Sequence, residues 1–302
     1  MKSVFCIALL CLLSSLTWAQ SRDILKLDYV HIGSGNTELD SKIAFTKYGA
    51  ELTIPQKLKS KDYIFHTLNY SNLNVSYNQD PINFTSSELE EFNSFSYRFT
   101  YLNIRENRLP YIISFSPTLS SNFEGSVQLK DIQFYGLFAF MKRYPSGSML
   151  HFGAMYSSSL GFPSPLPYVS YKMKWGGKWQ ANFGFPKLGV KCQISPKNEL
   201  GAGLALTGEN MRLGKNLDVT NAGGVQNKVV PIDNVRMQNI GGVLDWVHQL
   251  NDYSKIKIGA GYTFRRRYGF YDGNKKMREF KLNNNIFLRA TLTFGYYKKS
   301  VK

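Results

Sequence analysis

The sequence predicts an all-β fold, a transmembrane antiparallel up-and-down β-barrel of about fourteen strands, with twelve as the alternative. Three observations support this prediction: side chains alternate between apolar and polar with a period of two, turn-forming clusters separate segments of about ten residues, and the connections alternate between short and long. No run approaches the ~20 consecutive apolar residues that a spanning helix needs. No stretch with a 3.6-residue period is long enough to form a competing helix.

The composition narrows the class of protein. The chain has 302 residues, with 37 Lys and Arg against 21 Asp and Glu, and a formal net charge of +16. Apolar residues make up 43% of the chain, enough to bury surface against the entropy of ordering, which excludes a disordered tail protein. Three cysteines cannot staple a chain of this length, so a disulfide scaffold is excluded as well.

The first element is a secretory signal peptide over residues 1–19. Lys2 gives the positive start, an apolar run covers residues 4–13, and Ala19 precedes the expected cleavage site. Residues 20–302 then form one barrel domain, because no Gly/Ser or Pro linker divides them. An exported chain meets little nucleic acid, so we expect outer-membrane lipid, lipopolysaccharide phosphates or an anionic solute as partners of the positive charge, and no nucleic acid.

The strands follow in order from the alternation of side chains. The clearest one places Phe95 and Phe99 on one face and Arg98 on the other, because successive side chains of a strand point to opposite faces. The last strand repeats the pattern, with Leu292 opposite Arg289. The same reasoning predicts strands near residues 23–31, 39–54, 62–77, 92–102, 110–119, 132–142, 149–157, 167–175, 179–185, 188–194, 200–208, 236–249, 254–265 and 284–297.

The connections give a second test, because outer-membrane barrels have short periplasmic turns and longer outer loops. With a periplasmic N-terminus, the inner connections are all short and lie near 55–61, 103–109, 143–148, 176–178, 195–199 and 250–253. The outer connections are mostly long and lie near 32–38, 78–91, 120–131, 158–166, 186–187, 209–235 and 266–283. The exception is 186–187. If the segments on either side of it are one bent strand or a disordered excursion, the barrel has twelve strands.

A soluble β-sandwich is the main alternative fold, because its strands also have one polar face. Several aromatic residues favour a membrane wall. Trp175 and Trp179 flank one tight turn and Tyr101 and Tyr111 flank another, as expected of aromatic girdles at a bilayer interface. The last strand alternates up to Phe294, close to the chain end, where barrel assembly signals usually lie.

Three segments carry a resemblance to a known family: 121–125 (SNFEG), 161–171 (GFPSPLPYVSY) and 184–187 (GFPK). They resemble a family of uncharacterised outer-membrane β-barrel proteins of Gram-negative bacteria, catalogued as a domain of unknown function. The resemblance runs over the mature chain, including residues 23–29. It implies an outer-membrane location and a β-barrel, and it carries over no catalytic or binding residues. The basic tail at 298–302 departs from a standard C-terminal assembly signal.

Basic residues form the predicted functional surface. Those on polar strand faces are predicted to line the lumen: Arg98, Lys191, Lys255, Lys257, Arg265 and Arg289. Others lie in the predicted surface loop at 266–283: Arg266, Arg267, Lys275, Lys276, Arg278 and Lys281. They favour a non-enzymatic passive channel or small transporter with anion preference, or a structural surface protein. Alternatively, the lumen charges only solvate the interior and are balanced by acidic residues such as Asp28 and Asp245.

No catalytic, metal or cofactor site is predicted. The four histidines lie on different predicted strands, and no pair of them has metal-ligand spacing. An outer-membrane lipid hydrolase is an alternative function, since His151 shares a strand face with Met149 and Gly153 and the neighbouring strands carry many serines. A secreted soluble binding protein with the sandwich fold is the other alternative.

Overall fold

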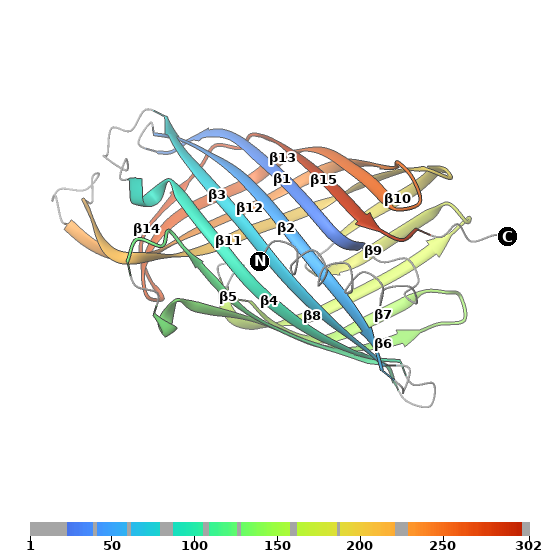
Figure 1. Cartoon of the computed structure of the whole chain (residues 1–302). Helices are drawn as coiled ribbons and strands as arrows, with labels where there is room; N and C mark the ends of the chain where they lie inside the picture. Colours follow the sequence, from blue (N-terminus) through green and yellow to red (C-terminus); the bar gives the residue numbers. More distant parts are fainter. Residues whose placement is uncertain are drawn as a thin grey trace, which may run out of the picture.

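The computed structural model describes residues 23–38, 41–58, 62–78, 87–104, 109–125, 128–157, 162–185, 188–220 and 229–297. These residues form an all-β barrel (Figure 1). The signal peptide predicted at residues 1–19 lies outside the described residues. In the described part of the chain, no helix is long and apolar enough to cross a membrane.

In the described ranges the strands are long, and two single-turn 3-10 helices lie between them. The helices are η1 (Ser87–Leu89) and η2 (Leu129–Asp131). The strands are β1 (Asp23–Asn36), β2 (Lys42–Lys57), β3 (Tyr63–Asn78), β4 (Glu91–Asn103), β5 (Tyr111–Ser121), β6 (Ile132–Arg143), β7 (Met149–Ser157), β8 (Phe162–Trp175), β9 (Trp179–Phe185), β10 (Leu188–Ser195), β11 (Asn198–Thr220), β12 (Val229–Gln249), β13 (Ser254–Asp272), β14 (Lys275–Lys281) and β15 (Ile286–Gly295).

Fourteen of these strands close into one antiparallel barrel. Each strand pairs with the next along the chain from β1 to β13, and β15 closes the ring by pairing with both β13 and β1. Among the described residues β14 pairs only with β13, as the second arm of a hairpin beyond the ring. The predicted count of fourteen is confirmed. The sandwich is excluded as the fold, because the strands form one closed sheet and not two stacked ones.

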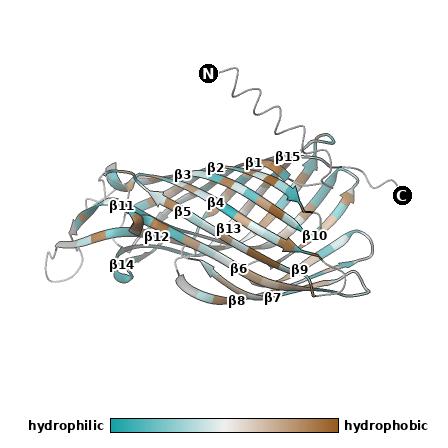
Figure 2. Cartoon of the chain, turned by 60° about the horizontal axis from the view of Figure 1, so that its bottom comes forward, coloured by the Kyte–Doolittle hydropathy of each residue, from teal (hydrophilic) through white to brown (hydrophobic). Residues whose placement is uncertain are grey.

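Apolar side chains cover the outside of the barrel wall. Phe95 is 51% exposed and Ile258 is 48% exposed, whereas the inward-facing Thr291 and Thr293 are buried. Figure 2 shows hydrophobic and hydrophilic residues alternating along the strands. A soluble protein would bury these side chains, so an apolar belt around a polar interior is the pattern of a barrel surrounded by hydrocarbon.

The polarity of the wall reverses toward the end with the longer connections. There the inward-facing residues are apolar and form a buried cluster, which includes Phe45, Val235, Tyr268 and Phe270. We call this cluster, contributed by β1 to β4, η1, β11 to β15 and the β14–β15 connection, the outer core. Burying one such side chain contributes about 1.5–3 kcal/mol. The outer core therefore fills the barrel as a soluble core fills a domain.

This reversal corrects two predicted loops. Residues 209–235 and 266–283 were expected to be loops, but β11 continues to Thr220, β12 begins at Val229 and β13 continues to Asp272. The two hairpins extend beyond the apolar belt, because their buried side chains pack on the outer core and no longer face hydrocarbon. β8 likewise begins at Phe162, inside the loop expected at 158–166.

The ends of β5 and β11 meet although five strands, β6 to β10, lie between them in the barrel. Ser121 pairs in parallel with Arg212. The Asn122 side chain accepts a hydrogen bond from the Gly214 N–H (2.9 Å) and donates one to the Glu88 carbonyl (2.9 Å). We call this contact the β5–β11 clasp. Because it joins the flanking strands directly, β6 to β10 stop short of the outer core.

Candidate functional site: the barrel lumen

The lumen below the outer core is hollow and polar. It contains adjoining cavities of about 520, 310 and 570 Å³. The first two share Lys257 and Arg289, and the last two share Lys47 and Glu209. The shared residues show that the cavities adjoin, and we call the three together the chamber; each of them is large enough for a small solute.

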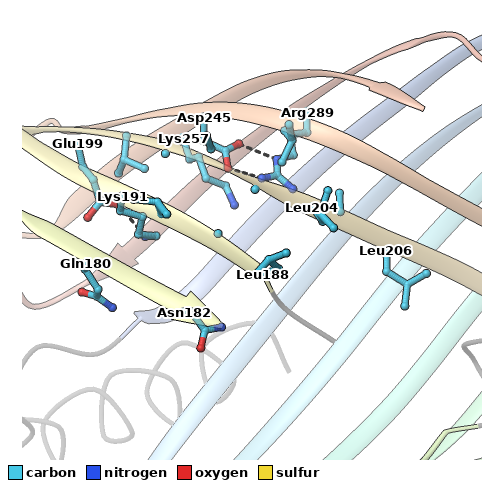
Figure 3. A pocket seen from close by; sticks show the side chains of 18 of the residues that line it. Gln180, Asn182, Leu188, Lys191, Glu199, Leu204, Leu206, Asp245, Lys257 and Arg289 are labelled. Carbon is cyan, nitrogen blue, oxygen red and sulfur yellow. Dashed lines mark hydrogen bonds and ion pairs between the residues drawn. The ribbon is translucent and has the colours of Figure 1, made fainter. Parts of the chain in front are cut away.

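The first cavity lies against the wall built by β8 to β13 and β15 (Figure 3). The Arg289 guanidinium makes two hydrogen bonds with the carboxylate of Asp245, one of them 2.7 Å from Nε to Oδ1. Lys191 forms an ion pair with Glu199 (2.7 Å). Lys257 lines the same cavity and has no ion pair among the described residues. It is therefore available to a solute.

An ion pair crosses the chamber. The Lys47 ammonium on β2 contacts the Glu209 carboxylate on β11, and these strands belong to opposite walls. The pair lies next to Phe45 and Met237 of the outer core. It therefore ties the two walls together at the level where the lumen ends. Sequence reasoning missed it, because two residues 162 positions apart give no local signal.

Most of the residues that alternation assigned to the lumen lie on the inner face. Arg98, Lys191, Lys257 and Arg289 line the cavities. Lys255 shares the inward face of Lys257, and its ammonium lies 2.7 Å from Asp23 at the short-turn end. Arg98, Lys191 and Arg289 have acidic partners in Glu51, Glu199 and Asp245. Much of the lumen charge is thus balanced, as the alternative interpretation expected.

Arg265 is the exception, and its predicted lumen position is wrong. The β12–β13 register shifts between Ile240 and Gly241, which inserts a bulge at Phe264. Arg265 then pairs with Ile240 and is exposed on the outer side, while Arg266 takes the inward position. A bulge moves every later side chain to the other face.

Arg266 does not belong to the surface, as its place in the predicted loop had implied. It is only 2% exposed, and its guanidinium donates hydrogen bonds to the Asn283 carbonyl (3.0 Å) and the Ile43 carbonyl (3.4 Å). It also lies 5.7 Å from the ring centroid of Phe45. Its hydrogen bonds connect β13 with β2 and with the segment that joins β14 to β15.

The other predicted loop residues lie on the β13–β14 hairpin. Arg267 binds Glu279 through two bonds of 2.9 and 2.8 Å, and Lys276 lies 3.3 Å from the same carboxylate. Lys275 and Lys281 are exposed. The Arg278 guanidinium lies over the Phe280 ring (4.7 Å), and burial lowers the pKa of Arg278 despite the opposing charge of Glu38.

The chamber reaches the outer side of the wall between β8 and β11. Its lining includes the outward-facing Leu188, Leu204 and Phe185. The β10–β11 pairing ends at Leu188 and Leu204, and the β8–β9 pairing ends at Val169 and Phe185. Within the described ranges, β11 from 205 to 211 and β8 from 162 to 168 thus have no strand partner on their facing edges. We call this break in the pairing the side window.

Local chemistry keeps these edges unpaired. Pro165 and Pro167 lie on the free part of β8, and proline has no N–H to donate to another strand. On the β11 edge, the Gln133 side chain donates a 2.6 Å hydrogen bond to the Asn210 carbonyl in place of a strand. The described parts of the segments that carried the family resemblance, 121–125, 162–171 and 184–185, border the side window or the clasp above it.

His151 faces the lumen but lacks the partners of a catalytic histidine. It is 8% exposed, pairs in register with Ser170, and its Nδ1 makes no hydrogen bond in the described structure. The Ser170 hydroxyl donates instead to the Asn182 side chain (2.6 Å). A Ser–His nucleophile needs a carboxylate that orients the imidazole. The described residues also contain no cluster of three or more metal-ligating His, Cys, Asp or Glu side chains.

The sequence matches one protein family. A family model described as "Domain of unknown function (DUF6268)" matches residues 28–295, which is nearly the whole barrel. No curated protein matches the sequence.

Several solved structures of outer-membrane proteins are similar to this chain at low sequence identity. An outer-membrane channel from Pseudomonas putida F1 is 10% identical, with 92% of this chain and 98% of that chain covered and a TM-score of 0.45. The toluene transporter TodX of P. putida is 11% identical, with coverages of 91% and 90% and a TM-score of 0.39. The Escherichia coli outer-membrane protease OmpT is 12% identical, with coverages of 93% and 99% and a TM-score of 0.29. These similarities concern the fold alone.

Proposed function

Because this chain belongs to the family described as domain of unknown function DUF6268 and closes into a fourteen-strand barrel, we propose that it is a passive channel of the outer membrane that prefers small anions. The observation that carries the proposal is the continuity of the polar chamber with the side window. Leu188 and Leu204 on the outer face of the barrel wall line the same cavity as Lys257 and Arg289 on its inner face. A solute in the chamber is therefore adjacent to an exit.

The proposed route leaves the barrel axis. The outer core fills the axial end, so a solute that enters at the short-turn end meets buried Phe45 and Met237 above the Lys47–Glu209 pair. The side window lies just below that level and beside the same Glu209. The route thus runs from the short-turn end through the chamber and out between β8 and β11.

The proposed anion preference rests on the unbalanced cations of the chamber. Lys257 and Lys172 line the first cavity and have no ion pair among the described residues. The cations of Lys47, Lys191 and Arg289 are each neutralised by a carboxylate. A small excess of positive charge inside a narrow chamber raises the local concentration of anions.

Planar-bilayer recording tests this proposal. We expect the wild-type barrel to conduct ions with a chloride-to-potassium permeability ratio above one. Lys257→Gln removes one unbalanced charge and should move the ratio toward one, while Lys197→Gln, in an exposed short turn, should leave it unchanged. Wild-type selectivity for cations, or no effect of Lys257→Gln, would contradict the anion preference. Absence of conductance would overturn the channel and favour a structural role.

A second pair of variants tests the side window. Gly208 lies on the unpaired edge of β11 and lines the chamber. Gly242 lies where β12 is paired with both β11 and β13, and nothing lies within 4 Å of the position that its Cβ atom would take. Gly208→Trp should lower single-channel conductance severalfold by filling the exit, and Gly242→Trp should not. Equal conductance of the two variants would show that solutes take another path.

A further inference from the structure

A group of cations faces outward directly beyond the apolar belt. The bulge in β13 turns Arg265 to the outer side, and Arg267 follows two residues later on the same face. Lys281 of β14 pairs with Arg267 across the hairpin, so it projects beside it. We call Arg265, Arg267 and Lys281 the outer cationic cluster.

The cluster keeps a net positive charge after its internal contacts are counted. Glu279 is the carboxylate it touches, and Arg267 and Lys276 share it. Arg265 and Lys281 are exposed and form no ion pair within the described structure. Arg265 and Lys281 can therefore contact an anion. Arg267 lies between them, held in place by its hydrogen bonds to Glu279.

The spacing of the cluster suits a phosphate group. Paired residues on neighbouring antiparallel strands lie about 5 Å apart, and residues two apart on one strand lie about 6.8 Å apart. Arg and Lys side chains are longer than these separations, so their ends can converge on one anion. Guanidinium and ammonium groups bind phosphate through charge-assisted hydrogen bonds, and the planar guanidinium can contact two of its oxygens at once.

Apolar side chains lie immediately below the cluster. Phe264 adjoins Arg265 at the bulge, and Tyr262 and Ile286 are exposed on the same side of the wall. Phe264, Tyr262 and Ile286 are 51%, 55% and 59% exposed. A molecule bound to the cluster through its phosphate would therefore have an apolar surface next to it, on the membrane side.

We propose that the outer cationic cluster binds the phosphate groups of a membrane lipid whose acyl chains lie along Tyr262, Phe264 and Ile286. A phosphorylated lipid of the lipopolysaccharide type has this combination of paired phosphates and chains. A free phosphate compound would gain nothing from the apolar side chains below, which is why a lipid is the better occupant. This inference concerns the outer surface and does not depend on conduction through the lumen.

Native mass spectrometry of the barrel in detergent tests the proposal with diphosphorylated lipid A as the probe. The wild-type barrel should retain this lipid in preference to the same lipid without phosphates. The double variant Arg265→Gln/Lys281→Gln should bind it about tenfold more weakly, since two charge-assisted contacts are lost. The control Lys178→Gln/Lys197→Gln removes two exposed charges from the short-turn end and should bind like the wild type.

Each other outcome overturns the proposal. Equal affinity of the wild type and the Arg265→Gln/Lys281→Gln variant would show that the cluster does not hold the phosphates. Equal loss in the Lys178→Gln/Lys197→Gln control would show that only total charge matters. Competition by pyrophosphate at the affinity of the lipid would assign the cluster to a soluble anion. Arg267 is left unchanged, because its loss would release Glu279. Heat-modifiable gel mobility confirms that both variants are folded.

Discussion

Arg266 makes a buried guanidinium part of the outer core. Its donors reach the Asn283 and Ile43 carbonyls, and the Phe45 ring lies beside it, while its Nε has no partner in the described structure. Burying a charge without a carboxylate partner costs free energy. Backbone carbonyls must therefore lie within hydrogen-bond distance of the guanidinium to offset the lost hydration. Gly35, which has no side chain, lets the backbone of β1 lie against the Arg266 guanidinium and the Asn283 carbonyl.

Gly35→Ala should weaken this part of the barrel. A Cβ atom at Gly35 would lie 2.5 Å from the Arg266 Nη1 and 2.6 Å from the Asn283 carbonyl, so side chain and backbone must both shift. Overpacking of this kind costs about 1–3 kcal/mol. The temperature at which the folded band disappears in heat-modifiable electrophoresis should fall. Gly242→Ala is the matched control, because nothing lies within 4 Å of its Cβ position. Equal melting of the two variants would contradict this account.

The sequence predicts which face of the sheet a residue occupies only as far as the first β-bulge in its strand. Lys257 and Arg289 were placed correctly, because alternation runs unbroken from the start of β13 and along β15. Arg265 and Arg266 were not, because one extra residue in the strand exchanges the two faces. Nothing in the local composition marks Phe264 as the bulged residue.

At the scale of elements, the clasp decides where the strands of the wall end. Asn122 replaces strand pairing with side-chain hydrogen bonds, and Phe123 takes a positive φ of 57°, a conformation that non-glycine residues seldom adopt. The ring of Phe123 packs on Phe95 at 6.0 Å. These contacts hold β5 against β11 and leave β6 to β10 below the outer core.

Asn122→Ala should loosen the clasp while leaving the barrel closed. The Gly214 N–H and the Glu88 carbonyl would lose their partner, at a cost of about 1–3 kcal/mol for each group that stays buried. Hydrogen exchange at Gly214 should become faster. The control is Asn251→Ala in a short turn, whose side chain accepts from the Tyr253 N–H. Unchanged exchange at Gly214 in Asn122→Ala would show that the clasp does not depend on this side chain.

The elements themselves were largely predictable, because an apolar belt imposes a strict period of two on every spanning strand. Prediction failed where the hydrocarbon ends. In the outer halves of β11 and β12 the apolar side chains point into the barrel and pack in the outer core. The pattern of apolar side chains outside and polar side chains inside, which identified the other strands, is therefore absent there. Pro117 lies within β5, yet Ser96 pairs with Thr118 and Phe99 with Phe115 in the same register, so no residue is inserted there. The missing N–H is accommodated by a local gap in pairing.

At the scale of the whole molecule, the barrel has two compartments of opposite polarity. The chamber is polar and hollow, and the outer core is apolar and filled. The Lys47–Glu209 pair lies at their boundary and bridges opposite walls. This arrangement could not be predicted from the sequence, because it depends on which strands face each other across the ring.

Glu209→Gln should change selectivity in the opposite direction to Lys257→Gln. The Lys47 ammonium would lose its carboxylate beside the side window, which raises the positive charge at the exit. The chloride-to-potassium permeability ratio should therefore increase in planar-bilayer recordings. Lys47→Gln should restore the balance when combined with Glu209→Gln. A lower ratio in Glu209→Gln would place the conduction path away from this pair.

The two sides of the clasp are 92 residues apart in the chain, and β6 to β10 occupy the interval. Closing so long a loop carries an entropy cost that only formed neighbours can offset. We therefore expect the clasp to form late in assembly, after the intervening strands have been inserted. A chain that stalls before this step would leave the end of β5 at Ser121 and the edge of β11 at Arg212 without a partner, and unpaired strand edges are places where misassembly with another copy begins.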